Sequence, residues 1–162
     1  MFNVLMNENI ITIGFLADHL DTIPTLVSWF RDQWPDYHAT WSDAEMEQDF
    51  LEDTSRDRLP IRLVAFESND LAGTIILREN GAEAPPEFQP ELGGLYVPQS
   101  HRGRGIGTEL VRLGMQVARD QGYATVYATT VAAVGILERL GWEFVKTVVQ
   151  SDGQLSLYRC KL

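Results

Sequence analysis

The stretch His101-Arg102-Gly103-Arg104-Gly105-Ile106-Gly107 is the most informative part of this 162-residue chain. It joins an apolar run typical of a strand, residues 92–97, to an amphipathic run typical of a helix, residues 108–121. Alternate glycines at such a junction leave backbone N–H groups uncovered at the positive end of a helix, where a phosphate or pyrophosphate binds. Arg102 and Arg104 add two positive charges beside them. The stretch therefore predicts a phosphorylated cofactor.

The spacing of the glycines indicates which cofactor binds. A Rossmann dinucleotide loop needs G-x-G-x-x-G, whereas these glycines stand at 103, 105 and 107, and the sequence has no Gly-Lys-Ser/Thr of a Walker loop. A nucleotide-binding protein is therefore disfavoured. What remains is Arg-x-x-Gly-x-Gly from Arg102 to Gly107, with Leu95-Tyr96-Val97-Pro98 before it and Leu140-Gly141-Trp142 after it. This combination resembles the acetyl-CoA-binding signature of the GNAT superfamily of N-acetyltransferases.

Hydrophobic periodicity and capping residues predict one domain over residues 1–162 with the element order βααβββαβαββ. We expect the first helix to begin with Thr22 as N-cap and Pro24 in its first turn. The second helix is expected to begin with a capping box of Ser42 and Glu45. The predicted strands cover residues 10–15, 61–67, 71–78, 92–97, 124–129, 142–150 and 155–162, with a turn at Asp152-Gly153 before the last. The later helices cover residues 108–121 and 132–140, and residues 80–90 form a loop.

The resemblance implies an α+β fold of three α/β/α layers, the GNAT fold, with a mixed, mainly antiparallel sheet. By that resemblance the sheet is splayed open between the strand that ends at Val97 and the strand that ends near Thr129. The pantetheine arm of acetyl-CoA would lie in the splay, and a backbone N–H near Leu95 or Tyr96 would polarise the acetyl carbonyl. No metal is expected. The predicted cofactor-binding residues are Leu95, Tyr96, Val97, Arg102, Gly103, Arg104, Gly105, Ile106, Gly107, Thr108 and Thr130.

The usual proton donor for the departing thiolate is missing. Many GNAT enzymes use a tyrosine within a pattern like N-x-x-A-x-x-L-Y-x-x-x-G-F, but alignment on Leu140-Gly141-Trp142 puts Leu137 at that position. The thiolate is then protonated by water or by another hydroxyl, from Tyr96, Tyr127 or Tyr158, or the domain is a non-catalytic, regulatory CoA-binding module. An active enzyme is favoured, because positioning and carbonyl polarisation supply most of the acceleration when an amine attacks a thioester.

The attacking amine must also lose a proton, since an alkyl amine has a pKa of about 10.4 and is almost fully charged at neutral pH. Glu91, at the start of the central strand, is the first candidate for the catalytic base, because many relatives carry a water-linked carboxylate there. The alternative is that Glu91 is a solvated charge at the end of a strand. His101 lies at the wrong end of that strand, and His19 and His38 are expected to be ordinary surface histidines.

Charge is distributed unevenly along the chain. Residues 1–90 hold 17 acidic and 5 basic side chains, and residues 91–162 hold 6 and 8, which together give the net charge of −10. Such a balance disfavours nucleic acid as a partner. The acidic half would instead attract a cationic substrate, unless it serves only solubility.

The segment between the first two helices, residues 29–41, mixes aromatic and acidic side chains around Pro35, which disfavours helix at the residue before it. It is expected to form an aromatic, acidic pocket for an ammonium group. The alternative is that these aromatic residues cover the open sheet. The predicted substrate-binding residues are Trp29, Asp32, Trp34 and Tyr37.

The sequence as a whole predicts a cytoplasmic enzyme that transfers the acetyl group of acetyl-CoA to a primary amine by direct attack in a ternary complex. The acceptor is a cationic small molecule or peptide, and the resemblance suggests a homodimer. No apolar run approaches the ~20 residues of a membrane span, so no membrane association is expected. The N-terminus has no basic signal region, and the single cysteine, Cys160, excludes an intrachain disulfide.

Overall fold

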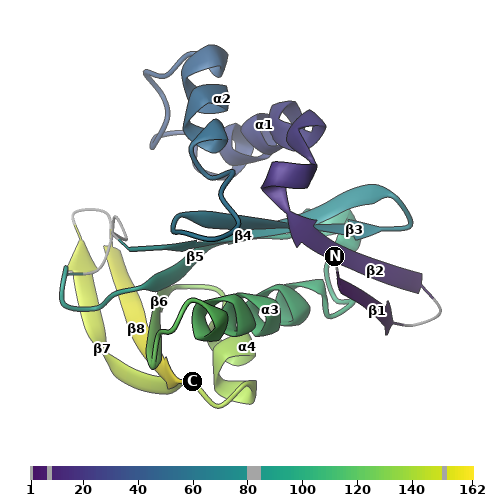
Figure 1. The fold of residues 1–162 in the computed structure, drawn as a ribbon. Coiled ribbons are helices and arrows are strands. Elements are labelled where there is room, and N and C mark those ends of the chain that lie inside the picture. Colours follow the sequence, from purple (N-terminus) through teal and green to yellow (C-terminus); the bar gives the residue numbers. More distant parts are fainter. Residues whose placement is uncertain (1, 7–8, 80–84, 151–152) are drawn as a thin grey trace.

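The computed structural model describes residues 2–6, 9–79, 85–150 and 153–162 (Figure 1). An eight-stranded sheet, in the order β1-β2-β3-β4-β5-β6-β8-β7, separates α1 and α2 on one face from α3 and α4 on the other (Figure 1). The strands are β1 (Phe2–Met6), β2 (Asn9–Phe15), β3 (Ile61–Glu67), β4 (Asp70–Arg78), β5 (Glu91–Tyr96), β6 (Thr125–Thr130), β7 (Glu143–Gln150) and β8 (Gly153–Lys161). The α-helices are α1 (Ile23–Gln33), α2 (Asp43–Leu51), α3 (Ile106–Asp120) and α4 (Val134–Arg139), and short 3-10 turns cover Leu16–Asp18, Leu20–Thr22 and Gln99–His101. The predicted three-layer GNAT fold is confirmed.

The sheet opens between β5 and β6, which are its parallel neighbours. Among the described residues their register consists of Glu91 opposite Tyr127, and the Tyr127 N–H donates to the Pro90 carbonyl at 3.0 Å. Beyond that point the two strands diverge, and residues of both line one cavity. The neighbouring pairs on either side, β4 with β5 and β6 with β8, are antiparallel. The predicted splay is therefore confirmed.

Local signals placed the helix ends to within two residues where bounds were predicted, since α3 covers Ile106–Asp120 and α4 covers Val134–Arg139. The capping box before α2 is present, because the Glu45 N–H donates to Ser42 Oγ at 3.1 Å and the Ser42 N–H donates to Glu45 Oε2 at 2.7 Å. Thr22 is the N-cap of α1, as predicted, but its side chain makes no capping hydrogen bond: its backbone is already helical, and its hydroxyl donates to the His19 carbonyl at 2.6 Å. A 3-10 turn thus leads into α1.

One further difference concerns a strand at the edge of the sheet. The edge strand β1 was not predicted, and it pairs antiparallel with β2. Asp152 of the predicted turn and residues 80–84 of the predicted loop lie outside the described residues. Residues 85–90 carry neither helix nor strand, as expected.

Tight packing of α3 against the sheet positions the loop that precedes this helix. A Cβ on Gly114 would lie 2.5 Å from Leu92 Cδ1, and a Cβ on Gly73 would lie 2.9 Å from Leu110 Cδ1. Two glycines, one on the helix and one on β4, thus allow an approach that any side chain would prevent. Apolar side chains of α1 and α2 form a second cluster on the opposite face of the sheet, so both faces are covered.

Candidate functional site

A cavity of about 880 Å³, called here the splay cavity, passes through the opening between β5 and β6. On one face of the sheet it is lined by the loop before α3 and by α4, and on the other face by α1, α2 and the segment between them. A cofactor on one side and an acceptor on the other would therefore meet at β5.

The loop before α3 has the geometry of an anion site. Gly105 is the N-cap of α3 with φ +82°, and Gly103 has φ +75°, so both are in the left-handed region that favours glycine. The first helical hydrogen bond runs from the Glu109 N–H to the Gly105 carbonyl at 3.1 Å, so the amides of residues 106–108 precede it. Six of the loop's predicted cofactor residues line the splay cavity, namely Arg102, Gly103, Gly105, Ile106, Gly107 and Thr108.

The two arginines of the loop have different partners. Arg102 lines the splay cavity, its Nε donates to the Val97 carbonyl at 2.7 Å, and its guanidinium lies 5.9 Å from the centroid of the Tyr96 ring. Arg104 does not line the cavity and instead forms an ion pair with Glu67. The buried Glu67 carboxylate also contacts His101 Nδ1 at 2.9 Å, so it ties the loop to the end of β3. Sequence reasoning missed Glu67, whose signal was an acidic residue at the end of an apolar run.

The central strand carries an irregularity where the acetyl carbonyl is expected. Thr74 pairs with Tyr96 and Ile76 with Gly93, so β5 has one extra residue in this interval. Gly94, within it, has φ +57°. A bulge of this kind releases backbone groups from the ladder and re-aims them. The predicted residues Leu95, Tyr96 and Val97 follow directly and line the splay cavity.

An apolar side chain, that of Leu137, stands at the position of the tyrosine that usually protonates the departing thiolate. Leu137 of α4 is buried and lines the splay cavity, as does Thr130, whose Oγ1 accepts from the Ala133 N–H at 2.8 Å. Of the alternative hydroxyls, that of Tyr96 belongs to a residue of the cavity wall. The Tyr127 ring packs against Phe88, and the Tyr158 hydroxyl donates to Glu138 Oε1 at 2.9 Å; neither residue lines the cavity.

Glu91 lies at the closed end of the splay and is 1% exposed, so the alternative of a solvated strand-end charge is wrong. Its Oε1 accepts from Arg78 Nη2 at 3.0 Å, and both residues line the splay cavity. The burial arises because β4 and β5 place the two side chains opposite each other, at the register pair Arg78 and Glu91.

A second buried ion pair lies beside the bulge. Arg62 Nε donates to Asp53 Oδ2 at 2.9 Å, and its Nη1 donates to Thr74 Oγ1 at 3.2 Å. The guanidinium lies 5.3 and 4.9 Å from the ring centroids of Phe30 and Phe50. Burial raises the pKa of Asp53, against the attraction of the Arg62 guanidinium.

Two of the four predicted acceptor residues line the splay cavity, and the other two do not. Trp34 and Tyr37 line the splay cavity. Trp29 packs against Tyr96 with 5.2 Å between the ring centroids, and Asp32 is exposed; neither lines the cavity. An acidic residue that does line it is Asp49 of α2, which the sequence did not single out.

His38 contradicts its predicted place on the surface. His38 is one of the residues that line the splay cavity and is 7% exposed, because α2 folds back against α1 and encloses the segment between them. His19 is half-buried and its ring packs against Phe66 at 4.7 Å between centroids.

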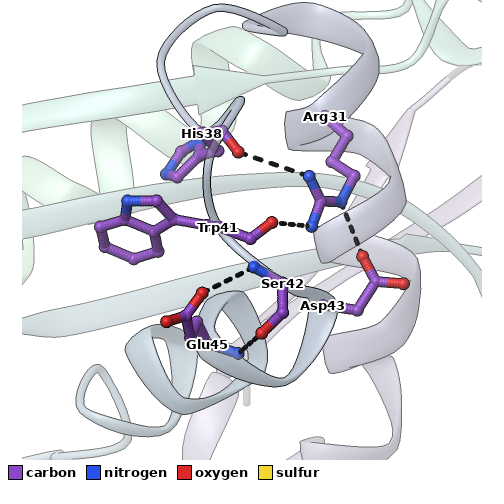
Figure 2. A network of polar contacts seen from close by, with 6 residues as sticks. All are labelled: Arg31, His38, Trp41, Ser42, Asp43 and Glu45. Carbon is purple, nitrogen blue, oxygen red and sulfur yellow. Dashed lines mark hydrogen bonds and ion pairs between the residues drawn. The ribbon is translucent and has the colours of Figure 1, made fainter.

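Arg31 holds the segment between the helices (Figure 2). Its Nη2 donates to the Trp41 carbonyl at 2.6 Å, its Nη1 donates to the His38 carbonyl at 3.4 Å, and its Nε pairs with Asp43 Oδ1 at 2.7 Å. One side chain of α1 thus fixes the backbone of the turn and the first residue of α2.

Within the described ranges, no three His, Cys, Asp or Glu side chains are grouped to hold a metal ion. None of the helices that the structure describes has the length and apolar character of a membrane span.

Solved structures share this fold across almost the whole chain. A putative acetyltransferase from Salmonella typhimurium, solved with its cofactor acetyl-CoA, superposes with a TM-score of 0.72 at 19% identity and 94% coverage of both chains. The ribosomal-protein-alanine N-acetyltransferase from Brucella melitensis has a TM-score of 0.71 at 22% identity, covering 93% of this chain and 99% of that one.

Sequence comparison identifies the family. Mouse N-acetyltransferase 8 is 32% identical over 113 residues, which cover 65% of this chain and 47% of that protein. Human N-acetyltransferase 8B is 42% identical over 61 residues, 35% of this chain and 27% of that protein, so the chain matches less than half the length of either relative. The family model described as the acetyltransferase (GNAT) family matches residues 26–142, which is most of the chain. With the cofactor loop, the splay and the bulged strand in place, this protein belongs to the GNAT family of acetyltransferases.

Proposed function

We propose that this protein transfers the acetyl group of acetyl-CoA to the primary amine of a cationic small molecule or peptide, by direct attack in a ternary complex. The observation that carries the proposal is the splay cavity, which joins the loop before α3 to the aromatic segment between α1 and α2 through the bulge of β5. Such a passage lets the acceptor reach the thioester from the face of the sheet opposite the pyrophosphate. Positioning two reactants in this way supplies a large part of the acceleration.

Different groups of the chain would bind the cofactor, polarise the acetyl carbonyl and remove the proton of the amine. Amides of residues 103–108 would hold the pyrophosphate, and a backbone N–H near Leu95 or Tyr96 would polarise the acetyl carbonyl. The amine nitrogen forms a bond to the carbonyl carbon, the carbon–sulfur bond breaks, and the sulfur leaves with the electron pair. Glu91 stays the predicted base; its burial at the cavity wall supports the role, and its ion pair with Arg78 competes with it.

The test is thiol release from acetyl-CoA across a panel of primary amines, with the mass of the acetylated product as confirmation. Turnover of at least one amine is expected. Tight binding of acetyl-CoA with no thiol release from any amine would identify a non-catalytic CoA-binding module, for which the absence of a tyrosine at position 137 is the supporting observation.

Leu137→Tyr is expected to leave kcat unchanged or to raise it by up to roughly 10-fold, because its hydroxyl would stand beside the departing sulfur. Leu137→Phe is the matched control, since it adds the same ring to this buried site without a hydroxyl. The comparison is of kcat for thiol release in the two variants. Equal rates, or a CoA complex in which residue 137 is more than about 8 Å from the sulfur and beyond hydrogen-bond reach, would show that the alignment is wrong.

Asp49→Asn is expected to raise KM for a cationic amine about 5-fold, which corresponds to the ~1 kcal/mol of an exposed charge pair, and to leave CoA affinity unchanged. Raising the salt concentration should lower kcat/KM for the same acceptor through screening. The double variant Asp32→Asn, Asp36→Asn removes charges from residues outside the cavity wall and should raise KM less. If an anionic amino acid proves the best acceptor, or if salt has no effect, the acidic half serves only as a solvated surface.

A further inference from the structure

His38 is a buried titratable side chain of the splay cavity to which the proposed function gives no role. The residue is 7% exposed, and its Nδ1 is shielded from solvent with no hydrogen-bond partner among the described residues. A buried polar atom without a partner costs free energy that a bound ligand can recover. The imidazole therefore has unused hydrogen-bonding capacity at the wall of the acceptor side.

The position of His38 is held by contacts that leave Nδ1 of its ring without a hydrogen-bond partner among the described residues. Arg31 binds the carbonyls of His38 and Trp41, and Figure 2 shows the guanidinium on one side of the turn and the imidazole and indole on the other. The imidazole packs edge-on against the rings of Tyr37 and Trp41, at centroid distances of 4.6 and 5.2 Å. Backbone and aromatic contacts thus orient the ring.

Burial of the ring favours its neutral form at neutral pH. Burial lowers the pKa of His38 from its ordinary value of 6.5; the carboxylate of Asp49, from α2, opposes this shift, and the guanidinium of Arg31, from α1, adds to it. A neutral imidazole carries a lone pair that accepts a proton, and Asp49 would then stabilise the imidazolium that forms.

We propose that His38 binds the acceptor amine on the cavity wall and accepts its proton before the attack, an inference that rests on the proposed function. The aromatic faces of Trp34 and Tyr37 hold the ammonium group first. One proton passes from the ammonium nitrogen to the imidazole, which becomes an imidazolium. The neutral amine attacks the acetyl carbon, and the carbon–sulfur bond breaks with its electron pair going to sulfur. The second amine proton passes to that sulfur through water, which gives the amide and the free thiol, and the imidazolium later loses its own proton to water.

Geometry favours His38 over Glu91 for this step. Glu91 lies where β5 and β6 are still paired, and its Oε1 already accepts from Arg78 at 3.0 Å. His38 belongs instead to the segment beside the predicted acceptor residues Trp34 and Tyr37, which line the same cavity. An incoming amine would meet the imidazole before the carboxylate.

The experiment compares His38→Gln, Glu91→Gln and wild type with an alkyl amine that the wild type acetylates. In the wild type, kcat/KM should fall on the acidic side of a pKa that lies below the ordinary histidine value of 6.5, because the imidazole becomes protonated there. His38→Gln should lower kcat about 100-fold and remove this acidic limb, with acetyl-CoA affinity unchanged by calorimetry. His19→Gln, a matched change of a histidine outside the cavity wall, should behave as wild type.

An arylamine acceptor separates proton transfer from structural support. It is already neutral at pH 7, so the loss in His38→Gln should largely disappear. An equal loss with both amines in a folded variant, or an acidic limb removed by Glu91→Gln and kept by His38→Gln, overturns the inference. If His38→Gln unfolds at a much lower temperature than the wild type, His38→Asn is used to repeat the test. A wild type that binds acetyl-CoA but acetylates no amine overturns the proposed function itself, and the inference with it.

Discussion

Replacing Gly105 with aspartate is expected to abolish the binding of acetyl-CoA while leaving the fold intact. The residue is the N-cap of α3 with φ +82°, so a side chain there is strained by about 1–2 kcal/mol. A carboxylate about 4 Å from a phosphate would add roughly 4 kcal/mol of repulsion at an effective dielectric constant of 20, or about 1,000-fold in Kd. Calorimetry with CoA and circular dichroism measure the two effects separately.

Gly122→Asp is the matched control for this variant. Gly122 follows the other end of α3 with φ +90°, and no atom lies within 4 Å of where its Cβ would be. The substitution therefore imposes a similar backbone strain and the same charge at a position remote from the cofactor loop. Affinity for CoA should stay at the wild-type value. An unchanged affinity in Gly105→Asp, or an equal loss in both variants, would contradict the anion site.

Asp53→Ala is expected to lower the free energy of unfolding by about 3–5 kcal/mol, because it leaves the buried Arg62 guanidinium without a counter-charge. Urea unfolding followed by fluorescence measures the change. Asp43→Ala is the control: its carboxylate is 75% exposed and pairs with Arg31, so the expected cost is at most about 1 kcal/mol.

Replacing both members of the buried pair, as in Asp53→Leu with Arg62→Met, should recover most of that stability. The recovery follows because the double variant leaves no uncompensated charge between Phe30 and Phe50. Equal destabilisation by Asp53→Ala and Asp43→Ala would show that Arg62 finds compensation elsewhere.

Features that depend on a few neighbouring residues could be predicted from the sequence. The glycines at 103, 105 and 107 predicted a tight loop before α3, and Gly103 and Gly105 do have positive φ, because conformational freedom is a property of the residue itself. The capping box of Ser42 and Glu45 was predictable for the same reason, since both hydrogen bonds span three residues. The edge strand β1 was missed because its five residues form a strand only by pairing with β2.

The burial and the charge partners of several predicted site residues depended on contacts between elements distant in sequence. Arg104 was predicted to face the cofactor, but Glu67, 37 positions away, engages it. Glu91 is buried rather than solvated because β4 brings Arg78 opposite it. His38 is enclosed because α2 packs back on α1, and Arg31 holds the turn between them. Local spacing therefore predicted the glycine-containing loop before α3. The surroundings of Arg104, Glu91 and His38 were decided only by the tertiary structure, because burial and charge partners arise from packing between elements.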